Sequence, residues 1–565
     1  MSKKYAIIIT LVTLAFFCVF FFWPVAGVLE RAFFTESGEF TIGSTLSVLS
    51  NPIYLEGLSN AFLLGVASTL VTFLVALPLA VMSHRWVFPG KRWLTLMVLA
   101  PLVLPPFVGA VGVRHILGTE GSLNALLSTI GLVSGDNPVD WLGASKFWGI
   151  VLMNALHLYP ILYMNILSSL SSLDPRMEQA AQNLGASPWT RFKKITLPLC
   201  MPGVFAGAAI VFIWSFTELG VPLVFDYTRV TPVQIYDGIK DLQGNPIPYV
   251  LVAVMLLVSV LIYFSSRVIL GRSQLGHSSK TKSQSMARPL PLVHGAMVSV
   301  AFLGVFIVAT IPHFGVFFLS VSEDWYGTVL PSGFTLAHYG EGLGHSQVVS
   351  SIRNSLVYAL GATFLDVLLG VGIAWVIVRS TIWGRRILDA MMMLPLAVPG
   401  IVLAFGFLSL TASSGFFGFL VPASGNPAMI LILAYAIRRL PFVVRAVVGG
   451  LEQSNIELEE AALSLGVTPS RSFLKISIPL IGSSLLAGAV LSFAFAMLEV
   501  SDSLMLAQQS EHFPITKAIY SLLSTLGNGH ELASALGVWA MLFLALAISG
   551  GLLVVGKKGG NLFRF

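Results

Sequence analysis

The chain has 565 residues, of which 56% are hydrophobic and only 10% are charged, and its formal net charge is +6. Soluble globular proteins carry about 25% charged residues, and a soluble chain this apolar would expose large patches that cause aggregation. The composition therefore excludes an ordinary soluble protein. It predicts membrane helices, because the strands of a membrane barrel would alternate polar and apolar residues.

The first apolar stretch, Tyr5 to Trp23, is longer than the core of a usual signal peptide, and no small-residue cleavage site follows it. We therefore expect a retained first helix. The two cysteines, Cys18 and Cys200, are isolated in the sequence. Thiols with such spacing predict neither a disulfide nor a metal site.

Apolar stretches of about 20 residues, the length that crosses a bilayer, recur along the chain. They predict an all-α integral membrane protein with about twelve spans. The spans are expected at 5–28, 61–83, 93–113, 147–170, 201–225, 248–270, 292–320, 354–379, 386–411, 427–449, 482–506 and 532–555. Lys and Arg concentrate in the segments that are cytoplasmic if both termini lie inside, as the positive-inside rule requires.

Two segments far apart in the chain have similar sequences. Residues 178–199 read EQAAQNLGASPWTRFKKITLPL and residues 459–480 read EEAALSLGVTPSRSFLKISIPL, which match at 11 of 22 positions without a gap. Residues outside these segments also match at constant offsets. These pairs are Asn60 with Asn354, Pro101 with Pro395, Pro105 with Pro399, and Glu218 with Glu499.

The matches predict two parallel repeats related by an axis along the membrane normal. We expect a first domain at 1–270 and a second, equivalent domain at 292–565, with the repeated loops at 174–199 and 455–480. Residues 271–291 between them are rich in Ser and Lys and predict a flexible cytoplasmic linker.

Each repeated loop predicts a helix, a tight turn and a second helix. In the first copy Gly185 is placed to cap the first helix, and Ser187-Pro188 is typical of an N-cap followed by proline. Gly466 and Thr468-Pro469 repeat this pattern. An interfacial hairpin that merely joins spans would explain one copy. Two copies with the same small residues, turn and proline indicate a docking surface for a two-fold partner.

This pattern resembles the EAA loop of ATP-binding-cassette (ABC) importer permeases: Glu-Ala-Ala, three residues, Gly, nine residues, Ile-x-Leu-Pro. The second copy fits with Ile478 in place of Leu, whereas the first has Gln179 at the glutamate position. The resemblance covers nearly the whole chain, as two domains of the type I importer fold. The loop residues that it identifies are Glu178, Gln179, Ala180, Ala181, Gly185, Pro198, Glu459, Glu460, Ala461, Ala462, Gly466 and Pro479.

In that family the loop is a coupling helix seated in a groove of the ATPase subunit. The resemblance implies a permease subunit in a bacterial cytoplasmic membrane, partnered by an ATPase homodimer and an extracytoplasmic binding protein. The sequence has no G-x-x-x-x-G-K-[ST] phosphate loop, so ATP and Mg would be bound by the separate ATPase. This chain is then neither an enzyme nor a cofactor-binding subunit. If the family's glutamate makes an essential ion pair, Gln179 predicts a weaker one in the first half.

Ionisable residues inside spans are candidates for the translocation pathway. Glu218 and Glu499 occupy equivalent places in spans five and eleven. They could face each other across the pathway, or each could be a hydrogen-bonded structural glutamate at a helix bend. Asp366 in span eight is a lone carboxylate without an assigned role.

Arg438 and Arg439 interrupt span ten just before Pro441, and His157 occupies the equivalent place in span four. Proline frees backbone groups that polar neighbours can satisfy, which favours a structural role for these residues. Attraction of an anion is the alternative.

The fused two-domain form, with a long polar loop between spans three and four, resembles ferric-iron importer permeases. It predicts ferric iron as the solute, with phosphonate, thiamine or another small ion as alternatives. The outer loops at 29–60, 114–146, 226–247 and 321–353 are expected to dock the binding protein.

Two other classes of protein fit less well. A secondary transporter also has parallel halves, but it would need no cytoplasmic docking loops and would show charged coupling residues in mid-span. A membrane enzyme would need a metal cluster or paired carboxylates, and the ten histidines form no H-E-x-x-H pattern.

Overall fold

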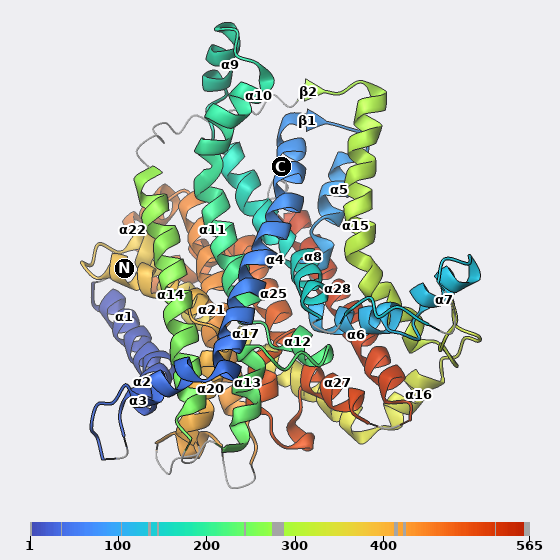
Figure 1. Ribbon diagram of the computed structural model, residues 1–565. Helices are drawn as coiled ribbons and strands as arrows, with labels where there is room; N and C mark the ends of the chain where they lie inside the picture. Colours follow the sequence, from blue (N-terminus) through green and yellow to red (C-terminus); the bar gives the residue numbers. More distant parts are fainter. Residues whose placement is uncertain are drawn as a thin grey trace. The chain divides into compact units, whose positions relative to one another are not determined.

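The computed structural model describes residues 3–35, 37–102, 104–133, 137–143, 146–241, 245–273, 288–411, 416–421, 425–525 and 527–558. Helices account for nearly all of the regular structure in these residues (Figure 1). The described strands, β1 (Trp86–Val87) and β2 (Arg288–Pro289), form one short parallel pair. The predicted all-α fold is confirmed. Most of the predicted linker, 274–287, lies outside the described residues.

Eight helical runs in the described residues are long and apolar enough to cross a membrane. Their bounds are Lys3–Phe33, Pro52–Arg85, Phe147–Ser171, Pro188–Val224, Ile247–Ser266, Leu292–Ser320, Ser346–Arg379 and Gly529–Gly551. Three bent pairs of helices raise the number to eleven if each pair is one span. The remaining predicted span corresponds to α21 (Ala428–Gln453), in which Arg438, Arg439 and Arg445 lower the hydropathy.

The chain divides into two compact units. One comprises Leu49–Ile235 and Leu257–Leu336. Its centre is three helices packed on one another, α4 (Pro52–Arg85), α8 (Phe147–Ser171) and α11 (Leu197–Phe216). Its other helices include α5 (Lys91–Met97), α6 (Pro106–Leu117), α7 (Ser122–Thr129), α9 (Pro175–Asn183), α10 (Pro188–Arg191), α12 (Gly220–Val224) and α15 (Leu292–Ser320).

The other unit comprises Met1–Val48, Tyr236–Leu256 and Ala337–Phe565. Its centre repeats the same arrangement with α17 (Ser346–Arg379), α21 and α25 (Gly482–Met497). Its other helices include α1 (Lys3–Phe17), α2 (Trp23–Phe33), α16 (Ala337–Gly344), α18 (Arg385–Met391), α19 (Leu394–Ala397), α20 (Gly400–Thr411), α22 (Glu457–Ser464), α23 (Pro469–Ser472), α24 (Ile478–Leu480), α26 (Ser501–Leu506), α27 (Ile515–Leu523) and α28 (Gly529–Lys558). Helices α3 (Gly43–Ser50), α13 (Thr231–Asp237) and α14 (Ile247–Ser273) lie across the unit boundaries.

The compact units do not coincide with the two sequence halves. Helix α2 packs on α20, and α1 packs on α17, although α1 and α2 begin the first half. Conversely, α15 begins the second half but packs on α5, α6 and α8. The equivalent three-helix centres confirm the predicted repeat. The domain boundaries predicted at 270 and 292 describe the repeat in the sequence and stay a prediction, since the compact units divide the chain at other positions.

Matched prolines break one span in each half. The runs Lys91–Leu102 and Pro106–Thr129 meet at 89°, and the runs Arg385–Ala397 and Gly400–Thr411 meet at 91°. Proline supplies no backbone N–H and disfavours helical geometry in the residue before it. The equivalence of Pro105 and Pro399 in the sequence therefore corresponds to the same sharp bend in both halves.

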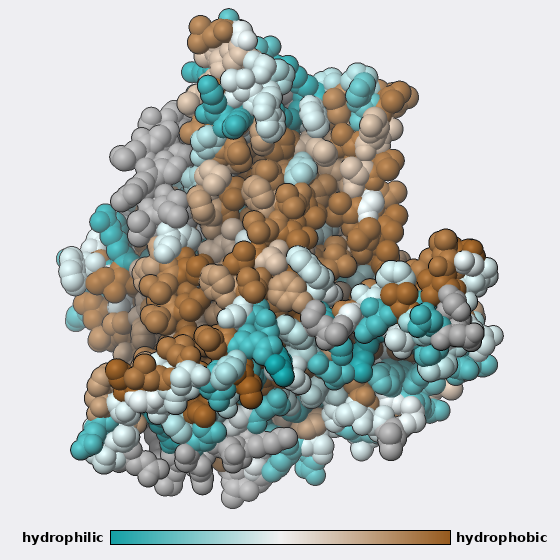
Figure 2. Space-filling model, in the orientation of Figure 1, coloured by the Kyte–Doolittle hydropathy of each residue, from teal (hydrophilic) through white to brown (hydrophobic). Residues whose placement is uncertain are grey.

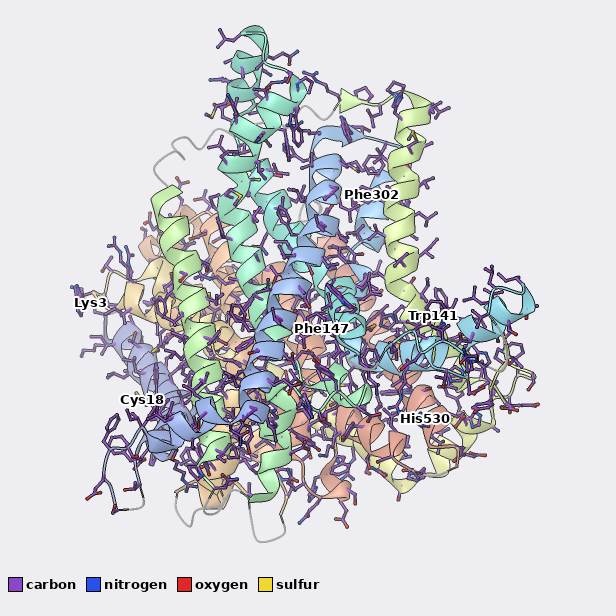
Figure 3. All side chains as sticks on the ribbon, viewed as in Figure 1. Lys3, Cys18, Trp141, Phe147, Phe302 and His530 are labelled. Carbon is purple, nitrogen blue, oxygen red and sulfur yellow. The ribbon has the colours of Figure 1, made fainter. Side chains whose placement is uncertain are left out.

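Apolar side chains cover the exposed surface of the long helices. Figure 2 shows this surface in brown along α4 and α15, and the exposed residues there include Leu63, Leu70, Leu74, Val300, Leu303 and Phe314. Inside the unit, Phe302 of α15 is fully buried and its ring centroid lies 5.1 Å from that of Phe88 (Figure 3). Cys18 is exposed and Cys200 is buried, and both are free thiols.

Glycines allow α8 and α11 to approach closely. A Cβ at Gly203 would lie 2.5 Å from the Asn165 carbonyl oxygen, and one at Gly207 would lie 2.7 Å from a Leu162 methyl group. This spacing of small residues, four apart on one helix face, therefore serves close helix packing.

We expect Gly203→Val to destabilise the protein by about 1–3 kcal/mol, because the added side chain must push the two helices apart. Gly304→Val is the matched control, since a Cβ at Gly304 would meet no atom within 4 Å. Thermal unfolding in detergent measures both variants. Equal unfolding midpoints for the two would contradict the packing role of Gly203.

Candidate functional site

The two repeated loops form helical hairpins of the same build. In the first, α9 and α10 are joined by a turn, and a π-helical segment, Phe192–Thr196, leads on to α11. In the second, α22 and α23 are followed by a π-helical segment, Phe473–Ser477. The predicted helix–turn–helix is confirmed in both copies. Beyond the π-helical segment the copies differ, because the second copy bends by 72° between Leu480 and Gly482.

Glycine makes the turn of each hairpin possible. Gly185 and Gly466 have φ of +79° and +84°, a left-handed conformation that costs other residues about 1–2 kcal/mol. The residue after each glycine closes the helix: the Ala186 amide donates to the Ala181 carbonyl at 3.0 Å, and the Val467 amide donates to the Ala462 carbonyl at 3.0 Å. This is a Schellman cap. The predicted glycine caps are confirmed.

The second helix of each hairpin starts at a proline. Ser187 accepts a hydrogen bond from the Thr190 amide at 3.2 Å and so acts as the predicted N-cap. Thr468 makes no side-chain cap hydrogen bond, although its backbone has the same extended conformation. The predicted N-cap positions are therefore confirmed in both copies, and the side-chain hydrogen bond is made in the first copy.

Each hairpin presents a small-residue and apolar surface. Ala180 and Ala461 are exposed, whereas Ala462 is buried. Leu184 is 88% exposed and the equivalent Leu465 is 84% exposed. Exposure of a large apolar side chain at the same point of both copies indicates a surface that another molecule covers.

The two acidic positions of the loop face different ways. Glu178 forms an ion pair with Arg85, and Glu459 forms one with Arg379 at 3.3 Å. The next positions, Gln179 and Glu460, are exposed. Gln179 therefore removes no ion pair from within the first unit. It removes a negative charge from the exposed face of the first hairpin.

The candidate pathway residues of the first half lie at a bend and a break. The protonated Nδ1 of His157 donates to the carbonyl of Pro101 at 2.8 Å, next to the broken span. Glu218 accepts hydrogen bonds from the amides of Gly220 and Val221 at 3.0 and 3.2 Å, and so caps α12. Both contacts favour the structural alternatives for these residues.

The equivalent residues of the second half form a buried charge cluster. Arg438 pairs with Glu499 at 2.5 Å and with Asp502 at 3.1 Å, and Arg439 pairs with Glu499. A Cβ at Gly400 would lie 2.2 Å from Arg438 Nη1, so this guanidinium covers the second broken span as His157 covers the first. Two arginines face two carboxylates. The cluster therefore offers no excess positive charge to attract an anion.

Sequence reasoning missed Asp502, Arg85 and Arg379 as partners in these sites. Asp502 lies in the first turn of α26 and follows Glu499 by three residues, a spacing that brings both to the start of this helix. Arg85 and Arg379 end the two longest helices at equivalent repeat positions, 294 residues apart. Both signals are present in the sequence. Asp366, which had no assigned role, accepts a hydrogen bond from the Ser492 hydroxyl at 2.6 Å.

A buried lysine lies outside the spans at the start of α27. Lys517 donates to the Leu504 carbonyl at 2.9 Å and to the Tyr236 hydroxyl at 3.1 Å. Its ammonium group also lies over the rings of Tyr236 and Phe513. Burial lowers the pKa of Lys517 to about 8 and raises the pKa of Tyr236 to about 12.

We expect Glu499→Gln to destabilise the protein by about 3–5 kcal/mol, because two buried arginines would share one remaining carboxylate. Glu218→Gln is the matched control at the equivalent position, where a cap of α12 is weakened at a cost of about 1 kcal/mol. Denaturant unfolding in detergent would compare them. A similar loss of unfolding free energy in both variants would show that Glu499 contributes no more to stability in the charge cluster than Glu218 contributes as a helix cap.

We expect stability to rise between pH 8 and 10.5, the ordinary pKa of lysine, because the unfolded chain then holds a proton that the buried Lys517 has lost. Lys517→Met should remove this rise, since it cannot titrate. Unfolding midpoints measured across this pH window test the effect. If the stability of Lys517→Met still rose over this pH window, the rise would belong to other titratable groups.

Comparison with known proteins identifies the family. The family described as "Binding-protein-dependent transport system inner membrane component" matches residues 53–275 and 366–556, so each half carries one copy. The solved structure of a bacterial ABC transporter for the acidic polysaccharide alginate covers 47% of this chain and 92% of its own, with 20% identity and a TM-score of 0.37.

Curated relatives named for ferric transport match both halves at once. The "Ferric transport system permease protein FbpB" of Actinobacillus pleuropneumoniae is 30% identical over 469 residues, which are 81% of this chain and 64% of that protein. The "Putative ferric transport system permease protein FbpB 1" of Haemophilus influenzae is 29% identical over 81% of this chain and 70% of its own length. The "Molybdenum transport system permease protein ModB" of Haemophilus influenzae is 33% identical over only 32% of this chain. This chain belongs to the family of binding-protein-dependent transport system inner membrane components.

Proposed function

We propose that this chain is the transmembrane permease subunit of an ABC importer, and that the importer moves ferric iron delivered by an extracytoplasmic binding protein. The observation that carries the proposal is the pair of equivalent hairpins, each with an αL glycine, exposed small residues and an exposed leucine. A two-fold partner with two equal grooves fits such a pair.

The partner on the hairpin side is an ATPase homodimer that binds ATP and Mg. Closure of the dimer would move both hairpins and open the permease outward, and hydrolysis would reset it. Such coupling requires that the hairpins bind the closed and the open dimer with different affinity. The side chains that would contact the ATPase are those that the sequence motif identifies, Gln179 to Gly185 and Glu460 to Gly466.

On this proposal the chain lies in a bacterial cytoplasmic membrane with both termini in the cytoplasm. The outer segments 29–60, 114–146, 226–247 and 321–353 then face the binding protein. Lys517, in the segment between α26 and α28, is on the same side. The distribution of Lys and Arg among the loops supports this orientation.

Ferric iron is supported by the extent of the matches. Relatives named for ferric transport align over 81% of this chain and so include both fused halves. Relatives named for molybdenum or sulfate transport align over about a third of it. The charge cluster of the second half gives no support to an oxyanion, because its arginines are already paired with Glu499 and Asp502.

Reconstitution in vesicles tests the proposal. The chain would be combined with its ATPase and candidate binding proteins, and uptake of ferric iron, molybdate, phosphonate and thiamine compared. We expect ferric uptake that stops when ATP hydrolysis is blocked. Uptake without hydrolysis would reject the assignment as an ABC importer. Hydrolysis-dependent uptake of another solute, without ferric uptake, would reject only the assignment of ferric iron as the solute.

A substitution in the second hairpin tests the docking surface. Gly466→Arg should abolish co-purification of the ATPase and reduce transport at least tenfold, since it strains the turn and places a long charged side chain on the exposed face. Gly527→Arg is the matched control: Gly527 has φ of +85° and open space around it, but lies between α27 and α28. Normal yield of the ATPase with Gly466→Arg would count against the proposal. Gly185→Arg should act in the same direction.

A further inference from the structure

In each unit one arginine joins the hairpin to the end of a long helix. Arg85 is the last residue of α4 and pairs with Glu178 of α9. Arg379 is the last residue of α17 and pairs with Glu459 of α22. A cation at a helix C-terminus is stabilised by the helix dipole, and the guanidinium can bond in several directions at once.

Arg85 holds both arms of its hairpin. Besides Glu178, it donates to the Thr196 hydroxyl at 3.0 Å, and Thr196 itself donates to Glu178. The guanidinium also lies 5.9 Å from the ring centroid of Phe192. Glu178 precedes the turn and Thr196 follows it, so a shift of either arm acts on the end of α4.

Arg379 makes the corresponding attachment with different partners. In addition to Glu459, it donates to the Leu451 carbonyl at 2.9 Å and to the Ser454 hydroxyl at 2.8 Å. The arginine and glutamate side chains are 10% and 14% exposed, against 26% and 34% for the first pair. The second attachment is therefore better shielded from water, which strengthens an ion pair.

The same two helices make an equivalent contact near their opposite ends. Asn60 of α4 donates to the Arg229 carbonyl at 2.8 Å, and Asn354 of α17 donates to the Glu511 carbonyl at 2.8 Å. These carbonyls lie just before α13 and α27. Each helix has 34 residues, so the inner arginine and the outer asparagine are about 25 residues apart, or roughly 37 Å at 1.5 Å per residue.

We propose that α4 and α17 are rods that carry the displacement of each hairpin to the segment before α13 or α27, with Arg85–Glu178 and Arg379–Glu459 as the inner attachments. The chain connects each hairpin directly to α8 and α11, or to α21 and α25, but not to α4 or α17. The long helix also packs along these helices, and the ion pair is the contact that joins its last residue to the hairpin itself. This inference rests on the proposed function, because the ATPase supplies the displacement.

The comparison of the two halves supports a division of labour within the loop. The halves keep the inner pair, since Glu178 and Glu459 correspond and so do Arg85 and Arg379. They differ at the next, exposed position, where one has Gln179 and the other Glu460. The inward glutamate serves transmission, and the outward residue serves the partner surface.

The test measures solute moved per ATP hydrolysed in reconstituted vesicles. We expect Arg85→Gln combined with Arg379→Gln to retain the ATPase on purification but to lower this ratio at least tenfold, because the ion pairs that pass hairpin motion to the ends of the rods are lost. The matched control is Arg92→Gln combined with Arg386→Gln. These two arginines are also repeat equivalents near the same helix ends, but they are exposed. The control should keep the wild-type ratio.

A charge exchange separates transmission from a loss of folding. Arg85→Glu combined with Glu178→Arg should recover at least half of the ratio that Arg85→Glu alone loses. A wild-type ratio in the double glutamine variant, or no recovery on exchange in a chain that still binds the ATPase, would overturn the inference. If the wild-type complex itself hydrolyses ATP without uptake of any solute, the proposed function fails instead.

Discussion

Hydrocarbon offers no hydrogen bonds, so each backbone group and charge inside a spanning protein must find its partner within the protein. This requirement is most acute where the spans are broken at Pro105 and Pro399, because a proline has no backbone N–H and leaves a carbonyl without its helical partner. In the first half single hydrogen-bonding side chains meet this requirement: His157 binds a freed carbonyl, and Glu218 caps a short helix. In the second half Arg438 lies over the break. Its buried positive charge must be neutralised, and Glu499 and Asp502 supply the carboxylates.

The two halves differ in the buried polar residues around the broken spans, where His157, Arg438 and Arg439 bond to residues of their own half. They are alike in the exposed hairpins, where we propose that one kind of partner binds both copies. The charge cluster of Arg438, Arg439, Glu499 and Asp502 is self-contained, so the first half can replace it with fewer charges. The hairpins share the glycine conformation, the cap hydrogen bonds and the exposed leucine. The symmetric partner that we propose would account for this similarity, since each hairpin would enter an equal groove.

Local signals made much of the fold predictable from the sequence. Apolar length predicted the spans, and the Gly185 and Gly466 caps followed from residues only a few positions apart. Thr468 occupies the predicted N-cap position, but its hydroxyl makes no cap hydrogen bond, because extended backbone at an N-cap does not oblige the hydroxyl to bond. Contacts between distant residues were not predictable in this way: Arg85 meets Glu178 across 93 positions of the chain. The packing of α1, α2 and α15 away from the cores of their own halves also depends on tertiary fit, which periodicity does not encode.

The account depends on both hairpins lying on one side of the membrane and touching the same kind of subunit. The most direct measurement introduces Ala180→Cys and Ala461→Cys, one at a time, into a chain with Cys18 and Cys200 replaced by serine. Both alanines are exposed. The account predicts that an impermeant thiol reagent reaches both only from the cytoplasmic side, and that each cysteine cross-links to an ATPase subunit. Labelling of either cysteine from the outer side, or cross-links from neither, would contradict it.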